Sequence, residues 1–209
     1  MSPEAARTRD IAQGQRIDAI LRAALTLFTE QGFQAARIAD VARAAGVAKG
    51  TVYLYFDSKE ALLKALIASH TAPPLEHVSS LIENHEGSAE ELLRKAIAML
   101  RSEVLETDRR LVIRLVLTEG HRFPEIAAYY HDSVLRRGMA FMSAIVRRGV
   151  DRGEFHHDAP ARFPQLVLAP LLLAVLWKEL FAEHAKLDTA AMLDAHVEFL
   201  LLGMKAEKT

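Results

Sequence analysis

The sequence predicts an all-α protein of about nine helices, with a small N-terminal domain followed by a larger one. Apolar residues recur every three or four positions along most of the 209-residue chain, which is the spacing of amphipathic helices. Runs of alternating β-branched residues and the dipeptides typical of tight hairpins are missing from the sequence, so it indicates no strand. A turn centred on Gly46 separates two short helical segments, and it marks the most informative part of the chain.

The first expected helix covers about residues 14–31. Its apolar positions recur at helical spacing: Ile17, Leu21, Ala24, Leu25 and Phe28. Gly32 and Phe33 follow and are expected to end it.

The next helix is short and ends in the glycine turn. Ile38, Val41 and Ala42 share one of its faces. Gly46 stands where the chain must leave this helix, a position that favours glycine because the backbone there has a positive φ.

A second short helix is expected within residues 48–56. Val52 and Phe56 lie one turn apart and are expected to point inward. The outer face then carries hydrogen-bond donors suited to a phosphate or a base edge. These donors are Lys49, Thr51, Tyr53 and Tyr55.

A third helix packs against this pair and completes a helix-turn-helix domain. Asp57 is expected to cap it, with Glu60 three residues further on. Its buried side is marked by Leu62, Leu63, Leu66 and Ile67. Spacing alone leaves an alternative open, because helical hairpins with a central glycine also occur in proteins that only pack against themselves. The expected domains are residues 1–68, with an ordered core from about residue 14, and 69–209.

The amino-acid sequence of this segment resembles that of the DNA-binding domain of TetR/AcrR-family transcriptional regulators. The matching segments are Gly32-Phe33, Ala45-Gly46-Val47, Gly50 to Phe56 and Ser58 to Leu63. The resemblance covers residues 14–68 by motif and the remainder only by length and helical character. It implies a homodimeric regulator that binds operator DNA, with a helical C-terminal domain for a small ligand.

Carried over residue by residue, the resemblance assigns six DNA contacts. Lys49, Gly50, Thr51 and Tyr53 match positions facing the major groove, and Tyr55 and Lys59 match phosphate contacts. Lys49 is the best candidate for a base contact, because lysine can donate to guanine O6 and N7. The chain departs from the family pattern by lacking hydroxyl caps, with Ala36-Arg37 and Ala48 in their place. Arg37 is expected either to contact a phosphate or to remain solvated.

Composition agrees with a soluble regulator. The chain has 51% hydrophobic and 25% charged residues and a net charge of −1, so any DNA-binding face must be positive only locally. It has no cysteine, which excludes disulfides and thiolate metal sites. Residues 1–15 show no secretion signal, and Pro170 interrupts the longest apolar run, residues 166–177. A cytoplasmic protein without a membrane helix is expected.

After residue 68 the chain reads as long amphipathic helices. Pro73-Pro74 is expected to end or kink the third helix. Ser88 and Asp188 are expected to cap later helices. The expected spans are residues 88–105, 109–119, 123–149, 158–184 and 188–203.

Helices that are apolar on more than one side need a second partner. Residues 166–181 fit this description, and in a chain of this size the partner is often another subunit. We therefore expect a homodimer formed through residues 160–184 and 188–203, although a monomer that completes its own core is an alternative. Two-fold symmetry would require a palindromic operator.

A ligand cavity in the second domain is suggested by bulky, adaptable side chains on several helices. The candidates are Met99, Leu115, Phe123, Tyr130, Phe141, Met142, Trp177 and Phe181. Trp177 and Tyr130 are preferred because each combines an apolar body with a polar group. The alternative for each residue is ordinary core packing. An apolar or amphipathic effector that releases a repressor from its operator is the expected outcome.

No enzyme, cofactor or metal site is expected. The candidate groups at residues 119–132 fit no catalytic spacing, and His156-His157 is better explained by solvated side chains than by a metal. Two other functions stay open. One is a DNA-binding regulator without a small-molecule effector, and the other is a helical protein-interaction module.

Overall fold

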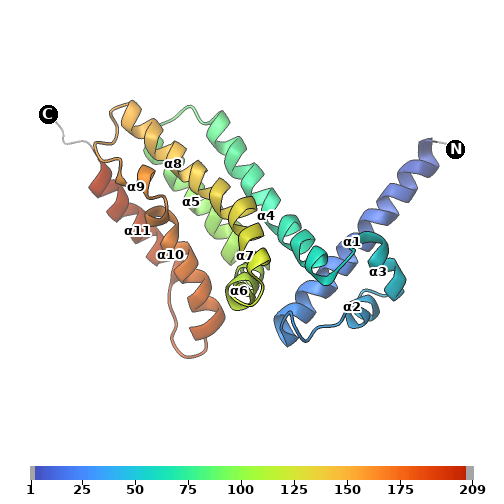
Figure 1. The fold of residues 1–209 in the computed structure, drawn as a ribbon. Coiled ribbons are helices and arrows are strands. Elements are labelled where there is room, and N and C mark those ends of the chain that lie inside the picture. Colours follow the sequence, from blue (N-terminus) through green and yellow to red (C-terminus); the bar gives the residue numbers. More distant parts are fainter. Residues whose placement is uncertain (1–2, 206–209) are drawn as a thin grey trace. The chain divides into compact units, whose positions relative to one another are not determined.

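The structure is a computed structural model that describes residues 3–205, so the expected domain limits at residues 1 and 209 lie outside it. Within this range all regular structure is helical, apart from one isolated antiparallel bridge between Phe155 and Lys205. This confirms the all-α prediction (Figure 1). The elements are α1 (Pro3–Gln31), α2 (Ile38–Ala44), α3 (Lys49–Tyr55), α4 (Lys59–Asn84), α5 (Ala89–Leu105), α6 (Arg109–Glu119), α7 (Pro124–Tyr130), α8 (Arg136–Asp151), α9 (Ala159–Arg162), α10 (Gln165–Leu176) and α11 (Thr189–Met204), with π-helical turns η1 (His131–Leu135) and η2 (Trp177–Phe181).

The chain divides into two compact units. The first contains the described residues up to Ser69 together with Leu115–Tyr129, and the second contains His70–Arg114 with the described residues from Tyr130 onward. The helices α4 and α6 therefore contribute residues to both units. The assignment of Leu115–Tyr129 to the first unit was not expected from the sequence.

The first unit is built around α1. Helix α2 packs against both α1 and α3, and the buried faces follow the expected spacing. Ile20, Phe28, Val41 and Val52 each have 1% or less of their surface exposed. From α4 the fully buried residues of this unit are Leu62, Leu63, Leu66 and Ile67, the four predicted from the sequence.

The second unit packs α5, α8, α10 and α11 around a shared core. The core residues of α5 and α8 include Leu92, Leu93, Met142 and Ile145, all fully buried. Two expected caps are confirmed, because the Ser88 side chain accepts from the Glu91 N–H at 3.1 Å and the Asp188 carboxylate accepts from the Ala191 N–H at 2.9 Å. Each satisfies one N–H of a helix start, which a helix cannot satisfy within itself.

Several boundaries differ from expectation. Helix α1 begins at Pro3 rather than near residue 14. The cap of α4 is Ser58 and not Asp57, because the Ser58 hydroxyl accepts from the Ala61 N–H at 3.0 Å. Helix α4 continues through Pro73 and Pro74, although prolines remove helix hydrogen bonds.

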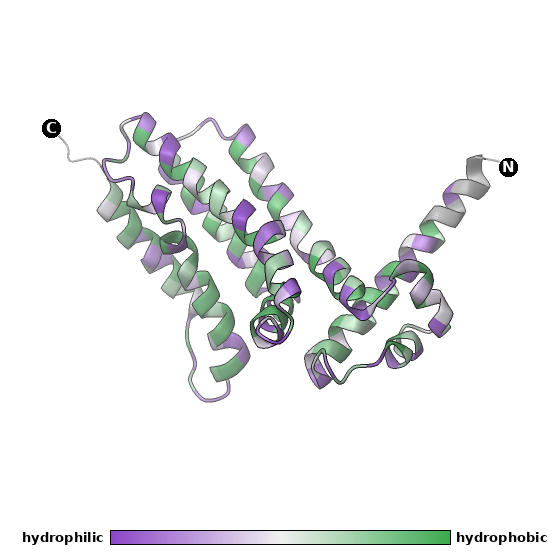
Figure 2. Ribbon diagram, in the orientation of Figure 1, coloured by the Kyte–Doolittle hydropathy of each residue, from purple (hydrophilic) through white to green (hydrophobic). Residues whose placement is uncertain are grey.

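The expected helix 158–184 is interrupted between α9 and α10. Phe163 leaves the helical conformation, with φ −126° and ψ 71°, because Pro164 disfavours α geometry in the residue before it. Helix α10 then starts directly after Pro164 and is predominantly apolar along its length (Figure 2). Among the described residues, no helix is both long enough and apolar enough to cross a membrane.

Candidate nucleic-acid interface

Helices α2 and α3 are joined by a tight turn whose backbone requires glycine. Gly46 has a φ of +67°, as expected. Its N–H donates to Arg43 O at 3.2 Å, and the Val47 N–H donates to Ala42 O at 2.9 Å. This pair of bonds is a Schellman motif, which satisfies the last carbonyl groups of a helix and turns the chain sharply. The turn thereby sets the direction of α3.

Helix α3 has one buried face and one exposed face. Val52 is fully buried, and Phe56, which follows the helix, is 8% exposed. Lys49, Gly50 and Tyr53 are exposed. These exposed residues lie on a short helix whose opposite face is buried. This is the geometry of a helix that presents side chains to the major groove of DNA.

A hollow of about 590 Å³ lies beside α3. It is lined by residues 34–39 together with Lys49, Tyr53 and Lys59. Four residues predicted to contact DNA therefore line the same hollow, since Arg37 belongs to the first segment. The Lys49 Nζ atom lies 5.8 Å from the centre of the Tyr53 ring, a cation–π distance that keeps the ammonium on the outer face. This arrangement offers positive charge and N–H and O–H donors to an anionic surface.

The other predicted DNA contacts lie away from the hollow. Gly50 is exposed on the outermost part of α3, and a Cβ atom added there would meet nothing within 4 Å. Thr51 and Tyr55 are half-buried on the opposite flank of the helix from Lys49 and Tyr53. The exposed surface of α3 is thus bordered by donors on both flanks.

Lys59, which is predicted to contact a phosphate, has its ammonium hydrogen-bonded within the protein. Its Nζ atom donates to the carbonyl oxygens of Phe33, Gln34 and Ala36 at 2.7, 3.0 and 3.1 Å. A lysine ammonium has three N–H donors, so these three bonds use all of them. The ammonium also lies 4.6 Å from the centre of the Phe33 ring. Lys59 therefore holds the loop between α1 and α2 in this structure.

The same loop is held on its other side by the segment around α6 and α7. The Phe33 N–H donates to the Glu119 carboxylate at 3.3 Å, and the Arg122 guanidinium donates to the Gln34 side chain. The Phe33 and Phe123 rings pack edge to face at 4.8 Å. Glu119 is 9% exposed, and its second oxygen has no hydrogen-bond partner among the described residues. Sequence reasoning missed Glu119, because 86 positions separate it from Phe33.

The absence of side-chain caps noted in the sequence agrees with the structure. Neither Arg37, at the start of α2, nor Ala48, at the start of α3, makes a side-chain capping bond. Arg37 is exposed, so its guanidinium is available to solvent or to a ligand of the hollow. The short helices are held by packing of Val41 and Val52, which have no exposed surface.

The eight candidate ligand residues lie in several environments, and three of them meet in one core. Leu115 and Phe123 belong to the first unit, where Phe123 packs on Phe33. Met99 and Phe141 pack against the core of the second unit, to which Met142 belongs. The remaining three are Tyr130, which is 8% exposed, and the pair Trp177 and Phe181, whose ring centres are 5.4 Å apart.

The two preferred ligand residues, Tyr130 and Trp177, have different environments. Burial raises the pKa of Tyr130 to about 12, because an apolar surrounding disfavours the phenolate. Trp177 uses its indole N–H within its own segment, donating to Ala185 O at 2.8 Å. Neither observation tests ligand binding, so both assignments stay predictions.

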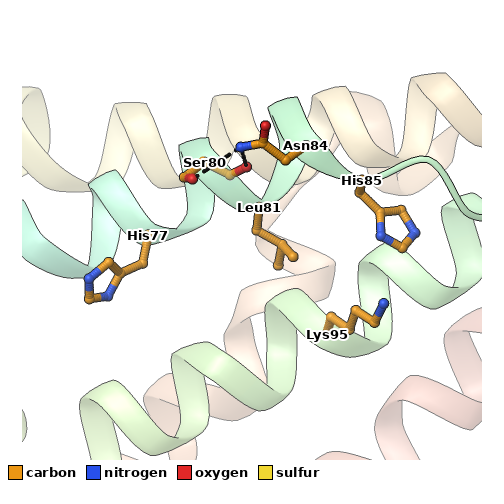
Figure 3. A pocket seen from close by; sticks show the side chains of 6 residues that line it. All are labelled: His77, Ser80, Leu81, Asn84, His85 and Lys95. Carbon is orange, nitrogen blue, oxygen red and sulfur yellow. Dashed lines mark hydrogen bonds between the residues drawn. The ribbon is translucent and has the colours of Figure 1, made fainter.

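A hollow of about 450 Å³ in the second unit has a different lining. Its residues come from α4, the turn after it, and α5, and are His77, Ser80, Leu81, Asn84, His85 and Lys95 (Figure 3). None of the eight candidate ligand residues is among them. Asn84 Nδ2 donates to Ser80 O at 2.8 Å, which leaves its amide oxygen free to accept. Within the described residues, no group of three metal-ligating side chains gathers here or elsewhere.

Two family models match this chain. Residues 20–66 match "Bacterial regulatory proteins, tetR family" and residues 83–198 match "Tetracyclin repressor-like, C-terminal domain". The HTH-type transcriptional regulator UidR of Escherichia coli (strain K12) is 28% identical over 157 residues, which cover 75% of this chain and 78% of the relative.

Solved structures share the fold. The regulator FadR from Bacillus subtilis, solved in complex with stearoyl-CoA, has a TM-score of 0.70 at 22% identity, with 88% of this chain and 97% of that chain covered. A regulator from Saccharomonospora viridis, solved in complex with choline, has a TM-score of 0.72 at 20% identity and coverages of 91% and 98%. The bound molecules differ greatly in size and polarity.

Proposed function

Because the chain belongs to the tetR family of bacterial regulatory proteins, it is a DNA-binding transcriptional regulator, and we propose that it is a homodimeric, effector-released repressor. The DNA surface that we propose is the exposed face of α3 with the hollow beside it. The observation that carries this assignment is the gathering of Arg37, Lys49 and Tyr53 around one hollow. These donors suit phosphate oxygens and base edges.

Within this surface we assign different roles to the predicted contacts. Lys49 reads a base, because its ammonium lies on the exposed face of the recognition helix. Arg37, Thr51, Tyr53 and Tyr55 contact phosphates and fix the register on the duplex. Lys59 acts indirectly, since its three donors hold the loop that carries Arg37.

The dimer is proposed to form through α10 and α11, as the sequence suggested. Large apolar side chains are exposed on these helices, with Phe199 at 74% and Leu202 at 71%. Phe199 and Leu202 are three positions apart and therefore share one face of α11. Burial of such a face against its copy would remove apolar surface from water. A two-fold dimer would then select a palindromic operator.

The proposed effector is a small apolar or amphipathic molecule bound in the second unit. The stearoyl-CoA bound to one solved relative is amphipathic, whereas the choline bound to another is a small cation, so the shared fold supports a small-molecule effector without specifying its chemistry. An effector can change DNA affinity only if it binds two states of the protein unequally. Helices α4 and α6 contribute residues to both units. We propose that effector binding in the second unit changes the loop at Phe33 through Lys59 of α4 and Glu119 of α6.

The site of action that follows from this proposal is the cytoplasm, where operator DNA is available. The chain is proposed to act without enzymatic activity. If DNA binding is insensitive to every effector tested, a regulator controlled by abundance or by a partner protein replaces the effector model. If no DNA sequence is preferred, a helical interaction module becomes the leading explanation.

The test is selection of bound fragments from a randomised duplex library at a stated, near-physiological salt concentration, because salt sets non-specific affinity. The parent protein should enrich a palindrome. Lys49→Ala should lose this enrichment or relax it at one position of each half-site. Lys95→Ala makes the same charge change in the second unit and serves as the control. A parent protein that enriches nothing would overturn the DNA assignment for this surface.

A further inference from the structure

The most exposed large apolar side chain in the described part of the chain lies on the recognition helix. Leu54 in α3 has 81% of its surface exposed. Leucine side chains are usually buried, and exposing one on a helix that presents donors to an anion has no packing benefit. Its place is what distinguishes Leu54, because it lies on the surface that we propose for DNA.

Helix geometry places Leu54 at the outermost point of α3. Leu54 and Gly50 lie two positions after and before Val52, so both project from the face opposite this buried residue. Side chains in helices lean toward the N-terminus, which brings Leu54 over the surface at Gly50. A Cβ atom at Gly50 would meet nothing within 4 Å. The leucine is thus exposed beside open space that a ligand can enter.

Gly50 is not required by the backbone at its position. It is a helical residue without a positive φ, since the positive-φ glycines of the described residues are Gly32, Gly46 and Gly153. Glycine inside a helix is less favourable than alanine, so its presence on the exposed face suits the close approach of another molecule.

The chemistry of the major groove identifies what Leu54 can contact. Base edges there carry donors and acceptors, and the apolar group among them is the C5-methyl of thymine. The flanks of α3 carry Lys49, Thr51, Tyr53 and Tyr55, whose donors match an anionic duplex better than an apolar protein partner. Leu54 therefore lies between two rows of polar side chains on α3. This order matches a major groove in which a thymine methyl group lies between two phosphate backbones.

We propose that Leu54 is a specificity-determining residue whose side chain packs against the methyl group of a thymine in each operator half-site. Gly50 leaves the room for this contact. This inference rests on the proposed function and adds to it the chemical identity of one base. It also separates two modes of recognition on α3, polar at Lys49 and apolar at Leu54.

The experiment uses the operator enriched by the parent protein and the full-length chain. Each symmetric pair of thymines is replaced in turn by deoxyuridine, which removes the methyl group and leaves the hydrogen-bonding edge unchanged. The parent protein should lose about three- to fifteenfold in affinity at one pair of positions, as expected for two methyl groups removed from an apolar contact. Leu54→Ala should bind the thymine and deoxyuridine operators equally well at that pair.

Two variants serve as controls. Leu54→Met keeps an apolar side chain and should keep the preference for thymine. Leu117→Ala removes another exposed leucine of the first unit, which is 47% exposed on α6, and should behave as the parent protein. Because Leu54 has little packing in the fold, Leu54→Ala should also keep the thermal stability of the parent.

The outcomes are distinguishable. Two results would overturn the role of Leu54 and leave the proposed function standing. In the first, the parent protein enriches an operator, but no deoxyuridine pair changes its affinity. In the second, deoxyuridine lowers the affinity of Leu54→Ala as much as that of the parent. An enriched operator without thymine in its half-sites would do the same. Failure of the parent protein to enrich any fragment would overturn the proposed function and this inference with it.

Discussion

The Nζ atom of Lys59 donates to the carbonyl oxygen of Phe33 at 2.7 Å, so the first residue of α4 holds the loop that leads into α2. The N–H of the same residue, Phe33, donates to the Glu119 carboxylate at 3.3 Å. Phe33 is fully buried, and its ring packs edge to face on both Phe28 and Phe123. The position of Arg37, four residues further on, therefore depends on contacts made by two distant segments.

Replacement of Lys59 tests this role. Lys59→Ala should lower the free energy of unfolding by about 1–3 kcal/mol, because carbonyl groups in a partly buried loop lose their donor. Lys49→Ala, which removes an exposed ammonium, should cost less than about 0.5 kcal/mol. Urea unfolding of the two variants measures the difference.

The salt dependence of operator binding separates a loop contact from a phosphate contact at Lys59. A lost phosphate contact lowers the slope of log affinity against log salt by about one. Lys59→Ala should weaken binding with the slope unchanged. Equal stability of the two lysine variants, together with a reduced slope for Lys59→Ala, would instead make Lys59 a direct phosphate contact.

Glu119 allows a matched pair of substitutions. Glu119→Ala should destabilise the protein by about 1–3 kcal/mol, because the buried Phe33 N–H loses its acceptor. Glu119→Gln keeps a side-chain oxygen acceptor and removes a charge that is nearly buried, so its stability should lie close to that of the parent. Chemical unfolding measures both variants. A Gln variant as unstable as the Ala variant would show that the charge, rather than the hydrogen bond, matters.

Gly50 should show opposite effects on stability and binding. Gly50→Ala places a methyl group in open space and should stabilise α3 by up to about 1 kcal/mol. Operator affinity should fall, because the added methyl occupies the surface that DNA approaches. Thermal unfolding and a binding titration on the same sample measure the two effects. Unchanged operator affinity in the stabilised variant would remove Gly50 from the DNA surface.

The apolar face of α11 provides a test of the dimer. Phe199→Glu and Leu202→Glu together should convert the protein to monomers at micromolar concentration, because each places a charge where apolar burial is expected. Leu117→Glu makes the same kind of change on an exposed leucine of α6 and should leave the assembly intact. Sedimentation equilibrium measures the mass. A double variant with the mass of the parent would exclude this face as the interface.

Tyr130 gives the protein a specific weakness at alkaline pH. Its folded pKa is raised to about 12 by burial, above an ordinary value of 10, so the unfolded chain loses the phenolic proton first. Between pH 10 and 12 the unfolded state therefore binds fewer protons, and the free energy of unfolding falls by up to about 1.4 kcal/mol per pH unit from this group. Tyr130→Phe should show a correspondingly shallower loss. Parallel slopes for the two proteins in urea unfolding across this range would contradict the assignment.

The parts of the fold that the sequence predicted correctly are set by local chemistry. The turn at Gly46, the caps at Ser88 and Asp188, and the inward orientation of Val52 each depend on residues within one or two helical turns. The break at Phe163 depends on the residue that follows it and could have been read from Pro164. Helix boundaries were wrong where only spacing was available, as at the start of α1.

The sequence by itself determined the all-helical class, the three-helix motif and the donors on α3, because helical periodicity, turn chemistry and residue type are local properties. Tertiary structure decided that Lys59 holds the loop at Phe33 and that Glu119 holds it from 86 positions away. It also decided that Phe123 packs on Phe33 while Met99 and Phe141 pack against the core that contains Met142. Spacing along a helix shows which face is buried, but it does not show which distant side chain will meet that face. That pairing depends on how the helices pack.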